Sequence, residues 1–132
     1  MQPSPWLASF GLLAGSLAPA APSAAPAEAR ARTAYLVVYR PGPAWVAGQP
    51  LGKQPLGEHG RYVLGLYTKG TLKFAGPFMD DTGGALVFEA ETEDEAAAVV
   101  AADPAVVSRV FVAERHPWRL VDWEQRAKRA AP

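Results

Sequence analysis

The chain has 132 residues, with 13 Lys and Arg against 13 Asp and Glu, two His and no Cys. This length predicts one domain with a hydrophobic core and excludes a multi-domain enzyme. A net charge of zero and a pI near 6.7 exclude the basic face typical of proteins that bind nucleic acids. The absence of Cys excludes a disulfide framework, a thiol nucleophile and cysteine-based zinc or iron–sulfur sites.

The first 29 residues differ in composition from the rest of the chain. Residues 6–18 (WLASFGLLAGSLA) are apolar or small and uncharged, Pro/Ala/Ser-rich residues follow, and the first Lys or Arg is Arg30. This stretch matches the hydrophobic region of a signal peptide and is shorter than the ~20 residues that span a membrane. We therefore expect residues 1–29 to be an export leader cleaved after Ala29, no stable membrane span, and a periplasmic or secreted protein. The first five residues lack Lys and Arg, so an Ala/Pro tail or a misplaced start codon on a cytoplasmic protein stays an alternative.

The chain then alternates strand and helix patterns, beginning with a strand and a long loop. Residues 33–40 (TAYLVVYR) are β-branched and aromatic and stop at Pro-Gly-Pro, which predicts a strand. Both faces of this strand are apolar, as is typical of a central strand covered on both sides. The Pro/Gly-rich residues 41–53 predict a long loop, which at this length is typically a functional lid or a disordered segment. If the loop is a lid, Trp45 is a candidate for covering a ligand.

Apolar residues recur at helical spacing between residues 54 and 69, which predicts an amphipathic helix ending at Gly70. The stripe consists of Leu56, Val63, Leu64, Leu66 and Tyr67. His59 lies on this stripe, three residues after Leu56 and four before Val63. Its ring is therefore expected to face the interior.

The second half of the chain predicts a hairpin, a helix and a last strand. Residues 71–75 and 85–91 are short strand patterns joined by an Asp/Gly turn. Thr92 and Glu95 have capping-box spacing, so a helix is expected to start there and to end near Asp103-Pro104. The later expectations are a main strand over residues 106–115 carrying Ser108, an interruption at Pro117-Trp118, a short edge strand over residues 119–122, and a polar, frayed tail over residues 123–132.

The order β-α-β-β-α-β over residues 33–122 is the ferredoxin-like pattern. It is an α+β fold with two helices on one face of an antiparallel sheet. The other sheet face then lacks a cover. Because the first strand is apolar on both faces, we expect a second copy to supply that cover in a homodimer.

Most motifs that carry chemistry are absent from the sequence. There is no dinucleotide-binding or P-loop glycine motif and no nucleophile elbow, and Ser108 is the only Ser after the leader. His59 and His116 do not have the spacing of metal ligands. We therefore expect neither a metal nor a cofactor.

One candidate pair remains, because His59 and Asp103 meet if the two helices pack side by side. An Asp that accepts from the Nδ1–H of a His fixes the tautomer and makes Nε2 a general acid/base. Two plainer interpretations stay open. A His on an apolar helix face is commonly a hydrogen-bonded core residue. An Asp before Pro104 is also a typical N-cap of a helical turn through residues 105–107.

Four short motifs occur in the order and at the spacing of a known family. They are Glu58-His59-Gly60-Arg61-Tyr62 with Leu66-Tyr67 and Gly70, then Leu72 with Gly76-Pro77-Phe78, then Ala101-Ala102-Asp103-Pro104-Ala105-Val106, then Pro117-Trp118. On these motifs, residues 35–121 resemble the YCII-related (YciI-like, DGPF) family. The resemblance implies a dimeric ferredoxin-like α+β barrel. It also implies a cleft centred on a His and an Asp, which correspond here to His59 and Asp103.

The resemblance also implies which residues line the cleft. Tyr62 and the backbone at Gly76 and Pro77 would line it, although Tyr62 is equally interpretable as a core residue. Ala75 stands where the motif that names the family has Asp, and this departure leaves the His–Asp pair unaffected. The export-like leader is unusual for a mostly intracellular family, so no cytoplasmic pathway role is carried over.

Barrels related to this family include cofactor-free isomerases, lyases such as dehydrochlorinases, and monooxygenases, which act on small cyclic or aromatic compounds. The resemblance therefore implies a cofactor-independent lyase or isomerase acting on a small aromatic or lactone-like compound. In that reaction His59 would transfer a proton, Asp103 would orient His59, and Tyr62 would donate a hydrogen bond to a developing oxyanion. The alternative is a non-catalytic dimeric module in which the His–Asp contact is structural.

Overall fold

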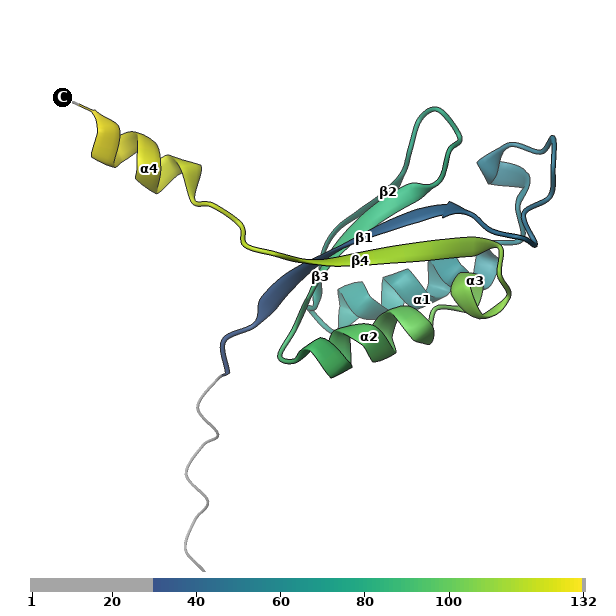
Figure 1. Ribbon diagram of the computed structural model, residues 1–132, viewed down its shortest axis with the longest axis horizontal. Helices are drawn as coiled ribbons and strands as arrows, with labels where there is room; N and C mark the ends of the chain where they lie inside the picture. The colour runs from purple at the N-terminus through teal and green to yellow at the C-terminus, as the bar shows by residue number, and fades with distance from the viewer. Residues whose placement is uncertain (1–29, 132) are drawn as a thin grey trace, which may run out of the picture.

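The computed structural model describes residues 30–131, so the expected export leader lies outside the described residues. The chain forms a four-stranded antiparallel sheet of order β2-β3-β1-β4, with three helices against one face (Figure 1). This is the ferredoxin-like α+β arrangement that the element order predicts. The elements are β1 (Thr33–Pro41), η1 (Leu51–Lys53), α1 (Gly57–Thr68), β2 (Leu72–Pro77), β3 (Gly84–Ala90), α2 (Glu93–Ala101), α3 (Pro104–Val107), β4 (Phe111–Trp118) and α4 (Trp123–Ala130).

Strand β1 lies in the centre of the sheet, between β3 and β4, as predicted. Its residues Tyr35, Val37 and Tyr39 point toward the helices and are buried, while Leu36 and Val38 alternate to the other face and are half-buried. Helices cover only the first of these faces in the described part of the chain (Figure 1). The core therefore lies between the helices and one face of the sheet.

Helix α1 ends where the sequence predicts. Lys69 caps it, and Gly70 follows with φ of 78°, in the left-handed region that glycine adopts without strain. The predicted buried stripe is too wide, however, because Leu64 and Tyr67 are 59% and 66% exposed. Since α1 packs over the edge strand β2, part of its apolar face has no sheet beneath it.

Two caps define the second helical layer. The Thr92 side chain accepts a hydrogen bond from the Glu95 N–H at 3.0 Å, which confirms the predicted start of α2. Asp103 caps α3 and Pro104 occupies its first position. The predicted strand over residues 106–115 is therefore wrong at its start, because these two signals outweigh the β-branched pair at residues 106–107. Ser108 is the C-cap of α3 and does not lie on a strand.

Strand β4 begins at Phe111 and continues through Pro117 and Trp118, where an interruption was predicted. Proline is tolerated there because β4 is an edge strand, which has one side without a ladder partner. The predicted edge strand over residues 119–122 does not form.

The expected frayed tail at residues 123–132 contains helix α4 instead. The Asp122 side chain accepts a hydrogen bond from the Gln125 N–H at 2.8 Å and starts this helix. Helix α4 has no buried residue and extends away from the sheet (Figure 1). Between residues 30 and 131, no helix is long and apolar enough to cross a membrane.

Candidate functional site

His59 and Asp103 meet between the helices. His59 lies near the start of α1, and Asp103 lies at the junction of α2 and α3. The Nδ1 atom of His59 is 2.8 Å from Oδ1 and 2.9 Å from Oδ2 of Asp103. Because a carboxylate only accepts hydrogen bonds, Nδ1 carries the hydrogen and donates it. The other ring nitrogen, Nε2, is then the one left to act on a ligand.

The carboxylate of Asp103 is fully buried and has a complete set of donors. Besides His59, it accepts hydrogen bonds from the Tyr39 hydroxyl at 2.8 Å and from the Ala105 N–H at 2.9 Å. A buried carboxylate needs such donors, because it has lost its hydration. Asp103 therefore acts as the N-cap of α3 and as the partner of His59 at the same time. The two sequence interpretations of Asp103 are not exclusive.

Tyr39 is the member of this group that the sequence analysis missed. Burial, followed by the negative charge of Asp103 and the hydrogen bond to it, raises the pKa of Tyr39 above its ordinary value. Its hydroxyl therefore stays protonated and continues to donate to Asp103. The signal for this role was its place on the buried face of β1, because a buried Tyr hydroxyl generally has a hydrogen-bond partner.

Aromatic rings hold the imidazole of His59 in place. The Tyr39 and His59 ring centroids are 5.2 Å apart at 76°, and those of His59 and Phe111 are 5.4 Å apart at 79°. Both contacts are edge-to-face arrangements, which aromatic pairs favour. Together with the bond from Nδ1 to Asp103, they fix the orientation of the ring.

A cavity of about 260 Å³ lies against His59, between α1 and the β2–β3 side of the sheet. Tyr39 and His59 are the only residues of its lining that have polar side chains. The hydroxyl of Tyr39 is already used by Asp103. In this otherwise apolar lining, the ring of His59 is therefore the polar group that Asp103 leaves with a nitrogen facing a ligand.

The structure separates the four predicted ligand-contacting residues into two groups. Gly76 and Pro77 line the cavity from β2, whereas Tyr62 and Trp45 are not part of its lining. The Tyr62 hydroxyl donates to the Val99 carbonyl oxygen at 2.7 Å, and burial and the charge of Asp103 raise its pKa. Tyr62 therefore links α1 to α2 and has no part in the function proposed below.

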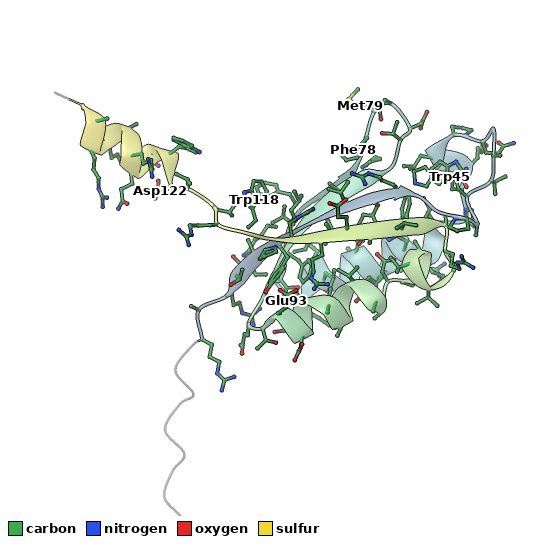
Figure 2. All side chains as sticks on the ribbon, viewed as in Figure 1. Trp45, Phe78, Met79, Glu93, Trp118 and Asp122 are labelled. Carbon is green, nitrogen blue, oxygen red and sulfur yellow. The ribbon has the colours of Figure 1, made fainter. Side chains whose placement is uncertain are left out.

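The predicted lid is a loop held by hydrogen bonds from one side chain. Figure 2 shows Trp45 on the loop that carries η1, and its ring centroid is 5.9 Å from that of Phe111. The Gln54 side chain accepts from the Val46 N–H at 2.8 Å and donates to the carbonyl oxygens of Val46 and Gln49, each at 2.9 Å. The loop reaches the cavity through Leu51, not through Trp45. Trp45 thus packs behind Phe111.

Metal binding requires several ligands that converge on one point. Within residues 30–131, no three His, Asp or Glu side chains lie close enough together to hold a metal ion. His116 is exposed on β4 and pairs with Glu114 at 2.8 Å, away from His59.

Comparison with known proteins identifies the family. The family model of the YCII-related domain matches residues 31–119. The chain belongs to the YCII-related family. The protein YjpA of Bacillus subtilis (strain 168), described as uncharacterized, is 35% identical over 72 residues, which are 54% of this chain and 85% of YjpA.

A solved structure has the same fold. It is 5-chloro-2-hydroxyhydroquinone dehydrochlorinase (TftG) from Burkholderia phenoliruptrix AC1100, in complex with 2,5-dihydroxybenzoquinone. The match has a TM-score of 0.50 at 23% sequence identity and covers 67% of this chain and 97% of the other. The likeness supports the ferredoxin-like fold of the YCII-related chain.

Proposed function

We propose that this YCII-related protein is a cofactor-independent lyase or isomerase in which His59 transfers a proton on a small cyclic compound. One observation carries the proposal. His59 is held at Nδ1 by a fully buried carboxylate while its ring forms part of the wall of an apolar cavity. A His oriented in this way presents Nε2 as a general base and, once protonated, as a general acid.

The proposed chemistry needs only residues of the site. Nε2 of His59 removes a proton from the bound compound, and the ring becomes an imidazolium. The carboxylate of Asp103 stabilises that cation through the Nδ1–H bond. The same proton then returns at a different carbon in an isomerase, or leaves with a departing group in a lyase. No electron is gained or lost by the protein in either case.

The shape and polarity of the cavity support a small aromatic or lactone-like substrate. Its lining includes the aromatic rings of Tyr39 and Phe111 and otherwise mostly small or aliphatic residues. Apolar walls with few polar groups are typical of sites for compact organic ligands. The fold relative TftG is a dehydrochlorinase whose structure holds 2,5-dihydroxybenzoquinone, and this agrees with a ring-shaped substrate.

A second candidate is a non-catalytic binding module. It is favoured by the full set of donors around Asp103, which gives the carboxylate a structural role as the cap of α3. In such a module, His59 would be a hydrogen-bonded core residue beside a cavity that binds a metabolite or stays empty.

The two candidates separate in a turnover assay on the full chain. The probes are 5-chloro-2-hydroxyhydroquinone, followed by chloride release, and an unsaturated five-membered lactone, followed by solvent deuterium exchange in NMR spectra. We expect turnover of at least one probe and a loss of about 100-fold or more in His59→Gln. Asp103→Asn keeps an oxygen for the cap of α3 but removes the charge, and we expect a similar loss.

The matched control is His116→Gln, because His116 is the other histidine and lies outside the cavity lining. This variant should keep the wild-type rate. Binding without turnover in the wild type would favour the binding module over the enzyme. Full activity in His59→Gln would exclude His59 as the group that transfers the proton.

We also propose that the protein is a homodimer formed through the open face of the sheet. Leu36 and Val38 form an apolar band with the paired residues Val87 and Ala85. Glu114 on the edge strand β4 pairs with Arg40 at the end of β1 at 3.1 Å, and this ion pair lies at the rim of the band. An apolar centre with a charged rim is the usual anatomy of an interface. Light scattering during gel filtration should give twice the chain mass, and a monomer at all concentrations would exclude the dimer.

The expected export leader remains a proposal of the same kind. We propose that residues 1–29 are removed after Ala29 when the protein is exported to the periplasm or the medium. Intact mass spectrometry of the exported protein should find a chain that begins at Arg30, and an uncleaved chain inside the cell would contradict export.

A further inference from the structure

The cavity lies beside a gap in the apolar face of α1. Leu56 and Val63 both line the cavity from this face. Position 60 is four residues after Leu56 and three before Val63, so it belongs to the same face. The sequence has glycine there, where a helix that packs on a sheet ordinarily carries a large apolar residue.

The space at Gly60 is empty of protein atoms. Gly60 lines the cavity, and a Cβ built on it would meet no atom within 4 Å. Protein interiors are otherwise close-packed, with few voids of this size between a helix and a sheet. The missing side chain therefore contributes directly to the volume next to the His59 ring.

A small residue of the facing sheet has the same effect from the other side. Ala75 on β2 lines the cavity and pairs with Leu86, which is buried on the helix face of the sheet. Gly76 and Ala85 pair with each other in register with Val38 on the opposite face, so they border the cavity with their backbone. Gly60 is exposed to solvent, so the cavity is open beside it.

We propose that Gly60 is a specificity-determining residue, whose missing side chain leaves room for a flat ring to lie against α1 beside His59. The proposal rests on the function proposed above, since it assigns the ligand to the same cavity. It adds that the size of the accepted ring is set by one position on α1. A larger residue at that position would exclude larger rings before smaller ones.

Helix propensity makes this proposal testable without loss of the fold. Alanine is more stable than glycine in the interior of a helix, so Gly60→Ala should raise the Tm while it narrows the cavity. The matched control is Gly65→Ala in the same helix. A Cβ at Gly65 also meets no atom within 4 Å, but Gly65 is not part of the cavity lining.

The experiment measures binding of phenol and of 2-naphthol to the full chain by NMR titration of the His59 ring resonances. We expect Gly60→Ala to weaken binding of 2-naphthol by about tenfold or more, because one added carbon overpacks the site. Binding of phenol should change little. Gly65→Ala should raise the Tm as well and bind both compounds like the wild type.

Three results would overturn the proposal. The first is a Gly60→Ala variant that binds 2-naphthol as tightly as the wild type, and the second is an equal loss in Gly65→Ala. The third is a wild type that binds neither compound, because Gly60 then borders no site for flat rings. The proposal that His59 transfers a proton is tested separately, by the turnover of the wild type and of His59→Gln. If binding depends on Gly60 but the wild type shows no turnover, the proposed enzymatic activity is wrong and the role of Gly60 in ring binding stands.

Discussion

The two helices of the ferredoxin-like layer cover the same face of the sheet in opposite ways. Beneath α2 the space is filled, since Phe88 and Ala96 are fully buried and Val100 is 8% exposed. Beneath α1 lies the cavity, and only Leu66 of that helix is buried. One half of the layer therefore supplies stability, and the other half leaves room for a ligand.

The polar trio lies where the two halves meet. Asp103 joins α2 to α3, Tyr39 comes from the central strand, and His59 comes from α1. Removing one member of a buried hydrogen-bonded group leaves the others without a partner in a medium of low dielectric. We therefore expect that a change at Asp103 or Tyr39 alters both the stability of the filled half under α2 and the orientation of the His59 ring beside the cavity.

Two substitutions, one in each half, test the contrast between the halves directly. Phe88→Ala should lower the free energy of unfolding by about 3–5 kcal/mol, because it opens a closed void in the filled half. Leu56→Ala should cost about 2 kcal/mol or less, because Leu56 is half-buried and its loss only widens a cavity that is already open. Urea unfolding of both variants measures the difference, and equal losses would mean that the two halves are packed alike.

A smaller loss of stability is expected for a substitution of Tyr39, at the boundary between the halves. Tyr39→Phe keeps the ring but removes the hydroxyl that donates to Asp103. We expect the free energy of unfolding at neutral pH to fall by about 1–3 kcal/mol, because a hydrogen bond to a buried charged group is lost. Activity on the probes should fall as well, since the carboxylate that orients His59 then has one donor fewer.

Tyr39 should also make the stability of the wild type depend on pH, and Tyr39→Phe should lack this dependence. The pKa of Tyr39 is raised by burial and by Asp103, so the folded protein holds the phenol proton more tightly than the unfolded chain. This contribution is complete below the ordinary pKa of about 10 and is lost as the pH rises through the folded pKa. Wild-type stability should therefore decline above pH ~10, by up to about 1.4 kcal/mol per pH unit from this group. A decline of the same slope in Tyr39→Phe would show that Tyr39 is not its source.

Local rules explain which parts of the fold were predictable. The interior placement of His59 and the end of α1 at Gly70 follow from helical spacing and a single glycine. The error at the start of β4 arose where two rules compete, because Val106 and Val107 favour a strand while Asp103 and Pro104 start a helix. The cap prevailed, since it satisfies buried backbone donors that a strand at this place would leave unpaired.

The site was less predictable than the fold because it depends on tertiary packing. The spacing on α1 indicates that His59 faces inward, but it cannot show that Tyr39 shares Asp103 with it. Tyr62 is one helical turn from His59, yet its hydroxyl turns to the Val99 carbonyl oxygen. The one sign of the cavity in the sequence is the glycine at position 60, within an apolar stripe. That this glycine borders a cavity depends on small residues of the sheet that lie opposite to it, which the sequence alone does not place there.

A smaller effect is expected at the caps of two helices, α2, which packs on the sheet, and α4, which has no buried residue. Thr92→Ala removes the side chain that caps α2, and we expect the free energy of unfolding to fall by about 1 kcal/mol. Asp122→Ala removes the equivalent cap of α4, which has no buried residue. Because α4 unfolds without exposing any core, its cap should contribute to local helicity and not to the global transition. In thermal unfolding experiments, we therefore expect a lower Tm in Thr92→Ala and an unchanged Tm in Asp122→Ala. A similar drop in Asp122→Ala would mean that α4 packs against a second copy of the chain.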